Sequence, residues 1–174
     1  MKTIRVMIIG STLEEVERIA KIVLNIPRTL QGTLQNFFQD FINWEIGPLS
    51  MLAGFDLEII RQHVDVTFPD LVIIAAGVTS EKRNDALECI EWFKKQHPSK
   101  KPLIITVSAL SSAEEDLRLW QAGTLCHVSL LGSSPKLIAQ VIRNFIILSY
   151  ERKILLEYFQ FVVDNQNEIS SLLS

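Results

Sequence analysis

The feature that most constrains this chain is a repeated alternation of short apolar runs with patterns typical of amphipathic helices. Three runs are rich in β-branched residues, and they cover residues 4–9, 71–75 and 103–107. Runs of this kind predict strands that are buried on both faces of a sheet, as in parallel sheets. Because a helical pattern follows each run, the chain is predicted to be an α/β fold with a doubly wound parallel sheet.

Two further strand–helix units bring the predicted number to five. Residues 124–131 are expected to form the last strand, and Pro135 to begin the last helix, since proline suits the first helical position. The second strand is expected at residues 44–46, with a helix over residues 52–62. Five units in a chain of this length predict the flavodoxin-like strand order 2-1-3-4-5.

Capping residues mark where two of the helices are expected to begin. Ser11 with Glu14, and Ser111 with Glu114, have the spacing of a capping box, and Gly123 is a suitable C-terminal stop. The helix that follows Ser11 is expected to present one apolar face, made of Leu13, Val16, Ala20, Val23 and Leu24.

The connection after the first helix is longer than five strand–helix units require. Apolar side chains recur within it at helical spacing: Leu34, Phe37, Phe38, Phe41 and Ile42. We therefore predict an inserted amphipathic helix over about residues 28–42, with Pro27 ahead of it. Packing on the surface of the domain itself is the ordinary outcome for such a stripe. The alternative is a helix that docks a partner protein.

Residues 135–174 are predicted to form a long helix that follows a domain of residues 1–134. At 1.5 Å per residue the helix could extend about 55 Å, well beyond a domain whose radius of gyration is about 14 Å. One apolar series repeats every seven residues: Val141, Leu148, Leu155, Val162 and Ile169. A second series lies three residues earlier and has two polar members: Ile138, Phe145, Arg152, Phe159 and Gln166. These heptads predict a coiled coil, and the repeats beyond Tyr150 need a second chain, so we expect a homodimer.

The order of these elements and their local sequences resemble the receiver domain of bacterial two-component response regulators. The resemblance covers roughly residues 2–149. It is carried by IRVMII at residues 4–9, PDLVII at 69–74, KPLII at 101–105, QAG at 121–123 and SPKL at 134–137. It implies the same flavodoxin-like fold and a role in signal transduction.

A receiver needs several groups at the carboxyl ends of its strands. An acidic pair holds Mg²⁺, an aspartate accepts the phosphoryl group, and a hydroxyl residue and a lysine contact its oxygens. The resemblance places other residues at these positions: Gly10 and Ser11 at the acidic pair, Ala75 at the aspartate, Val107 or its neighbour Ser108 at the hydroxyl, Leu130 at the lysine and His127 at the aromatic switch. It thus implies a degenerate pseudo-receiver that is not phosphorylated, holds no metal and acts through protein contacts.

The sequence gives little support for other chemistry. It has neither a Gly-x-Gly-x-x-Gly nor a Walker A loop, so we expect no nucleotide cofactor. His63, His97 and His127 have no metal-binding partner at helical spacing. Cys126 and His127 are neighbours on a predicted strand and point to opposite faces, which argues against a catalytic pair. We expect Cys126 to be buried and His127 to be half-exposed.

Composition excludes further classes of function. A net charge of −3 gives no electrostatic reason to bind nucleic acid. No apolar run approaches the ~20 residues of a membrane span. Two cysteines are too few for a disulfide scaffold, which suggests a reduced, cytoplasmic protein.

Two functions of different classes stay open. The first is a non-catalytic, receiver-like signalling module that binds a signalling protein or an output domain. Its last helix is typical of linkers to kinase, cyclase or antitermination domains, which suggests the N-terminal part of a longer regulator. The second is a flavodoxin-like sensor that binds a small ligand at the carboxyl ends of its strands, lined by Gly10, Ser11, Ala75 and Ser108.

Overall fold

A five-stranded parallel sheet lies at the centre of the protein. The computed structural model describes residues 2–30, 44–47, 49–76, 80–96, 101–108, 112–130 and 133–172. The strands of this sheet are β2 (Val6–Gly10), β4 (Ser50–Ala53), β5 (Leu71–Ala76), β6 (Leu103–Ser108) and β7 (Cys126–Ser129). Their spatial order is β4-β2-β5-β6-β7. Numbered by their sequence within this sheet, this is the order 2-1-3-4-5, so the predicted fold is confirmed.

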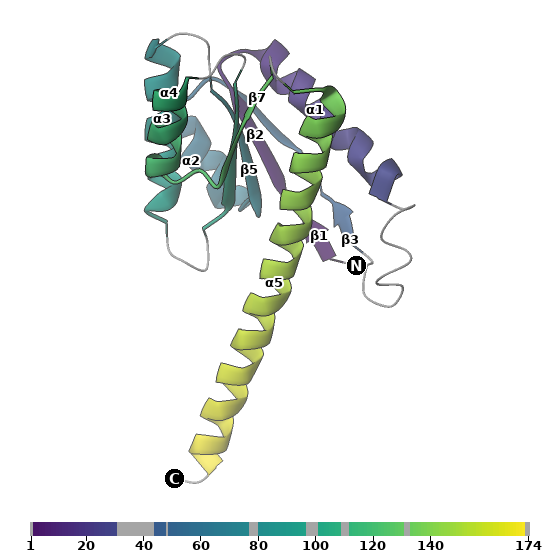
Figure 1. Ribbon diagram of the computed structural model, residues 1–174. Coiled ribbons are helices and arrows are strands. Elements are labelled where there is room, and N and C mark those ends of the chain that lie inside the picture. Colours follow the sequence, from purple (N-terminus) through teal and green to yellow (C-terminus); the bar gives the residue numbers. More distant parts are fainter. Residues whose placement is uncertain are drawn as a thin grey trace.

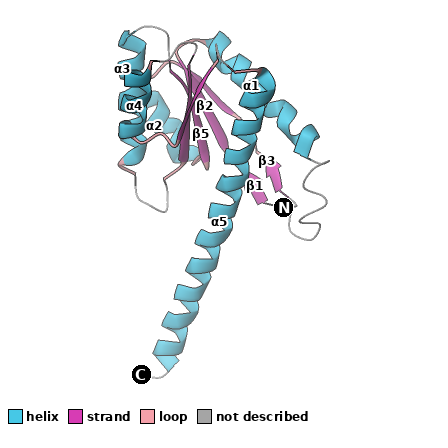
Figure 2. Ribbon diagram, in the orientation of Figure 1, coloured by secondary structure: helices cyan, strands magenta, loops and turns pink. Residues whose placement is uncertain are grey.

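Helices cover both faces of the sheet (Figures 1 and 2). One face carries α2 (Leu57–Val66), α3 (Ser80–Lys94) and α4 (Ala113–Ala122), and the other carries α1 (Leu13–Leu30) and α5 (Pro135–Leu172). Side chains alternate along β2 between the two layers. Val6 and Ile8 pack in the layer of α1 and α5, whereas Met7 and Ile9 pack in the layer of α2, α3 and α4. Burial on both faces explains the uninterrupted apolar runs in the sequence.

The second strand lies later in the chain than the sequence predicted. Trp44–Ile46 is a strand, β3, but it pairs in parallel with β1 (Lys2–Ile4) in a separate two-stranded sheet. The edge position beside β2 belongs to β4, which falls where we expected the start of a helix. Along β4, Leu52 is buried while Met51 is exposed, the alternation of a half-buried edge strand.

Local chemistry explains why the helix after β4 starts late. Gly54 has φ +106°, a conformation that glycine adopts freely, and it ends the strand. Asp56 then caps α2, because its carboxylate accepts hydrogen bonds from the backbone N–H groups of Glu58 and Ile59. The helix therefore begins at Leu57 and not at Leu52.

Helix α1 differs from the prediction at both ends. Its capping box is Thr12 with Glu15, one residue later than expected. The Thr12 hydroxyl accepts from the Glu15 N–H at 3.3 Å, and the Glu15 carboxylate accepts from the N–H groups of Ser11 and Thr12. Of its predicted apolar face, Leu13 and Leu24 are exposed, while the other three residues are buried.

The C-terminal end of α1 corrects the predicted start of the inserted helix, because residues 28–30 belong to α1. The helix continues through Pro27 to Leu30, and the buried side chains of Val23 and Ile26 hold its last turns against the sheet. This packing offsets the single backbone hydrogen bond that a proline removes. The rest of the predicted insertion, including Leu34, Phe37, Phe38 and Phe41, lies outside the described residues.

Helix α5 begins at Pro135, as predicted, and contains 38 residues. Ser134 caps this helix, because its hydroxyl accepts a hydrogen bond from the Leu137 N–H. Ile138, Ile142 and Ile146 fill the core beside α1, so the first part of α5 belongs to the domain. The remainder projects away from the sheet (Figure 1).

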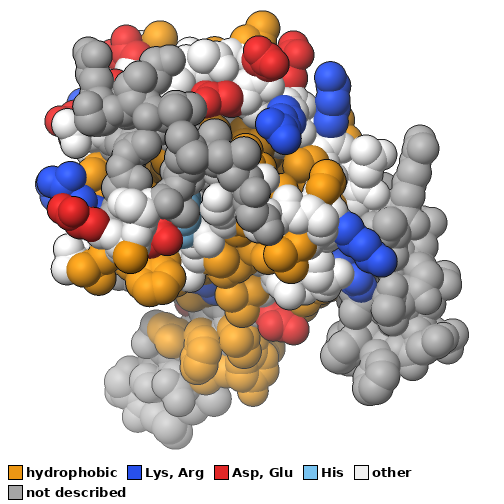
Figure 3. Space-filling view, turned by 45° about the horizontal axis from the view of Figure 1, so that its top comes forward, with side chains coloured by type: hydrophobic (Ala, Val, Ile, Leu, Met, Phe, Trp, Pro, Cys, Tyr) orange, Lys and Arg blue, Asp and Glu red, His pale blue; other side chains and the backbone are white. Residues whose placement is uncertain are grey.

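The projecting part of α5 is covered with hydrophobic side chains (Figure 3). Those that are exposed extend beyond the two predicted heptad series: Leu155, Leu156, Tyr158, Phe159, Phe161 and Val163. Within the described part of the chain, no helix is long and apolar enough to cross a membrane. Charged residues such as Glu157 and Asp164 lie among the apolar side chains of α5.

Candidate functional site

The positions that correspond to a receiver's phosphorylation site lie side by side at the carboxyl ends of the strands. Gly10 at the end of β2 pairs with Ala75 of β5, and Ala75 pairs with Val107 of β6. Ser108 follows Val107 and pairs with both Ala76 and Ser129. The topology therefore brings together the residues that the sequence analysis singled out.

This edge of the sheet is closely packed at Gly10. A Cβ atom on Gly10 would lie 2.9 Å from Val16 Cγ2 and 3.2 Å from the Ala75 Cβ. An aspartate at position 10 would thus require the sheet or α1 to shift. Ala75 and Val107 are buried, and Leu130, at the lysine position, packs against the core on the side of α1 and α5.

The nearest carboxylate of α1 is already engaged. Glu15 accepts two backbone hydrogen bonds as part of the capping box, and the Ser11 hydroxyl oxygen is buried without a hydrogen-bond partner among the described residues. The described ranges also contain no group of three or more His, Cys, Asp or Glu side chains that could hold a metal ion.

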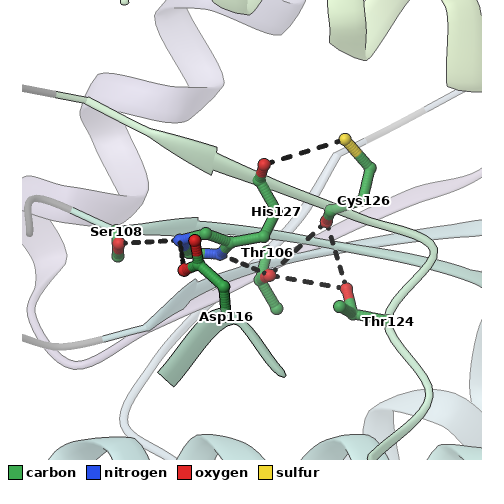
Figure 4. A network of polar contacts seen from close by, with 6 residues as sticks. All are labelled: Thr106, Ser108, Asp116, Thr124, Cys126 and His127. Carbon is green, nitrogen blue, oxygen red and sulfur yellow. Dashed lines mark hydrogen bonds and ion pairs between the residues drawn. The ribbon is translucent and has the colours of Figure 1, made fainter. Parts of the chain in front are cut away.

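His127 lies beside this edge in a polar network that links β6, β7 and α4 (Figure 4). Its side chain is only 3% exposed although the residue as a whole is half-buried, so the ring lies deeper than the predicted half-exposed histidine. Nδ1 lies 2.8 Å from the Thr106 hydroxyl, and Nε2 lies 3.0 Å from the Ser108 hydroxyl and 3.3 Å from the Asp116 carboxylate. Thr124 extends the network through its contact with Thr106.

The partners of the ring accommodate both of its protonation states. The hydroxyls of Thr106 and Ser108 can each donate or accept, so the hydrogen bonds of the neutral ring are satisfied with its proton on either nitrogen. When the ring is protonated, Nδ1 donates to Thr106, whose hydroxyl can turn to the Cys126 carbonyl oxygen at 3.4 Å. Burial lowers the pKa of His127 below its ordinary value of 6.5, and Asp116 acts in the opposite direction.

The network does not have the geometry of a catalytic triad. In a triad the nucleophile contacts one ring nitrogen and the carboxylate orients the ring through the other. Here Ser108 and Asp116 both approach Nε2. The described residues therefore support a positioning role for His127, joining α4 to the sheet, and not acyl transfer.

Neither cysteine is activated as a nucleophile. Burial raises the pKa of the Cys89 thiol to about 12, and it also raises the pKa of Cys126. Cys126 is half-buried, whereas we had expected it to be buried. A thiol reacts through its thiolate, which both environments disfavour.

Three members of the His127 network, Thr106, Asp116 and Thr124, were not predicted from the sequence. Thr106 interrupts the apolar run Leu-Ile-Ile-Thr-Val-Ser, and such a hydroxyl in a buried strand signals an internal hydrogen bond. Asp116 gives no comparable signal, because a charged residue in the first turns of a helix is ordinarily solvated.

The residues predicted to form a dimer seam occupy two different environments. Ile138 is 2% exposed in the core, so its assignment to an interface is wrong, and Val141 and Phe145 pack against that core. Further along α5, Leu148, Leu155 and Phe159 are exposed and Val162 is half-buried, while the side chain of Ile169 lies outside the described residues.

Arg152 also differs from the prediction. We had placed it in the seam, but its guanidinium donates to the Lys101 carbonyl oxygen. Next to it, Lys153 donates to the Thr3 carbonyl oxygen at 3.0 Å and lies 3.4 Å from the Asp70 carboxylate. Contacts with the domain therefore continue past Tyr150, and the free part of α5 starts later than expected.

Comparison with known proteins identifies the fold. No protein-family model matches the sequence, and neither does any curated protein. Among solved structures, the chain is similar to the signal receiver domain of the putative response regulator NarL from Mycobacterium tuberculosis, with a TM-score of 0.58 and 10% identity over 84% of this chain and 98% of that one.

Two other solved structures match this chain with the same TM-score. A CheY-like response regulator receiver domain protein from Methanospirillum hungatei has a TM-score of 0.58 and 13% identity, covering 87% of this chain and 99% of that one. A putative pilus assembly-related protein from Burkholderia pseudomallei has a TM-score of 0.58 and 12% identity, covering 83% and 90%. The chain therefore has the fold of a response-regulator receiver domain.

Proposed function

We propose that this protein is a non-catalytic, receiver-like signalling module that works without aspartate phosphorylation. The observation that carries the proposal is what lies at this edge of the sheet: the buried Ala75 stands at the nucleophile position, and Gly10, at the metal-binding position, is packed against Val16 and Ala75 with no room for a carboxylate. A receiver fold without these groups retains its surfaces for binding other proteins. We infer that its partners are signalling proteins or an output domain, and that it acts in the cytoplasm.

We further propose that the module forms a parallel homodimer through the projecting part of α5. Six large apolar side chains are exposed there between residues 155 and 163, and two of them, Leu155 and Phe159, lie in the predicted heptad series. Burial of these two on both helices of a pair contributes about 1.5–3 kcal/mol per side chain, which is comparable with an association cost of about 4–15 kcal/mol. The heptad spacing of Leu148, Leu155 and Val162 favours a coiled coil.

Beryllofluoride with Mg²⁺ tests the absence of phosphorylation, because it mimics a phosphoryl group on aspartate. We expect no saturable change in the backbone amide NMR signals of Gly10, Ala76 and Ser108, while a phosphorylatable receiver treated in parallel responds. Saturable, Mg²⁺-dependent shifts at these residues would contradict the proposal.

The same spectra test the alternative of a small-ligand sensor at this edge. Titration with nucleotides and flavins should leave these amides unchanged, since the sequence has no glycine-rich loop that could hold a phosphate. A saturable response to one compound would favour the sensor.

A further inference from the structure

A cavity lies at the amino ends of the strands, where α5 leaves the domain. The phosphorylation-site positions lie at the carboxyl ends, on the opposite side of the molecule. Its volume is about 220 Å³. Its walls come from the β1–β2 junction, the segments before β5 and β6, and α5 around residues 149–157. It therefore joins the amino ends of the strands to the start of the projecting helix.

The cavity has an excess of positive charge. Four cationic side chains face two carboxylates, a formal excess of two in a chain whose net charge is −3: Arg5, Lys101, Arg152 and Lys153, against Asp70 and Glu157. Such a concentration of one sign around a concave surface attracts counter-charged ligands.

The cations are only partly neutralised by the protein. Arg5 and Lys153 share a single carboxylate. Arg5 Nε and Lys153 Nζ each lie 3.4 Å from Asp70 Oδ2, and the Asp70 side chain is 15% exposed. The Lys101 ammonium has no ion pair among the described residues. Arg5, Lys101 and Lys153 can therefore supply donors to a ligand oxyanion, while Asp70 holds two of them in place.

Most of the remaining lining of the cavity is apolar. Phe68, Pro69 and Leu156 contribute to it, together with Ser149. An inorganic ion would leave this wall unused, whereas an anion attached to an aromatic or aliphatic group would contact both parts. The volume lies below the usual 300–1,000 Å³ of ligand pockets, which favours a molecule of about ten heavy atoms over a dinucleotide.

We propose that this cavity, the α5-root cavity, binds a small organic oxyanion, a phosphate or carboxylate attached to an apolar group. The oxyanion contacts Lys101 and Arg5, and the apolar part lies against Phe68 and Leu156. Since Lys153 and Leu156 belong to α5, the bound ligand ties the start of the projecting helix to the strand ends. This site is separate from the degenerate edge at Gly10.

Phenyl phosphate and phenylacetate are suitable probes, each titrated into the full chain and followed by amide NMR. We expect saturable 1:1 shifts clustered at Arg5, Phe68, Asp70, Lys101 and Lys153. Benzyl alcohol, which lacks the anion, and inorganic phosphate, which lacks the ring, should bind more weakly. The stronger of the two anionic probes identifies the preferred oxyanion.

Lys101→Gln tests the electrostatic part, because its ammonium makes no ion pair among the described residues and its loss should leave the fold intact. We expect it to weaken binding about tenfold, as for the loss of one charge-assisted contact. Lys136→Gln makes the same charge change on an exposed residue at the other end of α5 and should have no effect. Equal affinities in the two variants, or shifts scattered over the surface, would overturn the proposal.

Discussion

The imidazole of His127 on β7 lies 3.3 Å from the carboxylate of Asp116 on α4, and this contact joins the helix to the edge of the sheet. The ring is almost fully buried, whereas the Asp116 side chain is about one-third exposed. The Asp116 oxygen that faces the ring is itself buried, and it accepts no hydrogen bond from the described residues. Protonation of His127 turns this contact into an ion pair.

The first prediction concerns stability against pH. Because the pKa of His127 is lowered in the folded state, the unfolded chain binds its proton first as the pH falls. The contribution of His127 is thus fully present above about pH 6.5 and is lost as the pH falls through the folded pKa. Urea unfolding at pH 7.5 and 5.5 should show a smaller decrease for His127→Gln than for the wild type. Equal decreases would contradict the prediction.

A second prediction concerns the closed edge at Gly10. Gly10→Ala should lower the free energy of unfolding by about 1–3 kcal/mol, because the new methyl group meets Val16 at 2.9 Å. Ser11→Ala is the matched control. It removes a buried hydroxyl that has no partner among the described residues, so it should be neutral or stabilising. Unfolding of Gly10→Ala at the same urea concentration as the wild type would contradict the prediction, since it would show that Val16 and Ala75 accommodate the methyl group.

Elements that depend on local interactions could be predicted from the sequence, whereas those that depend on non-local pairing could not. The strands β2, β5 and β6 were predictable because burial on both faces leaves a local signature, although the predicted strand of residues 4–9 also took in Ile4, which belongs to β1. The choice between β3 and β4 was not, since both segments form strands and only their pairing with β1 or β2 distinguishes them. Similarly, the contact between His127 and Asp116 depends on how α4 packs, which no local pattern encodes.

The third prediction concerns the start of the projecting helix. Asp70 accepts from the Arg5 N–H at 2.8 Å and lies close to both the Arg5 and the Lys153 side chains. Asp70→Asn should destabilise the domain by about 1–3 kcal/mol, because it leaves two cations facing each other without a counter-charge. Hydrogen exchange should increase around residues 149–156 of α5. Unchanged exchange there would show that Lys153 does not hold the helix.

The last prediction is dimerisation through α5. Wild-type protein at tens of micromolar should sediment as a dimer, because a monomer leaves Leu155, Phe159 and their neighbours in water. Leu155→Glu combined with Val162→Glu places two charges in the seam and should produce a monomer that stays folded, since neither residue belongs to the core. Gln160→Glu adds a charge on the polar side of α5, next to Asp164, and should leave the mass unchanged. A wild-type monomer, or a double variant that keeps the dimer mass, would exclude this seam.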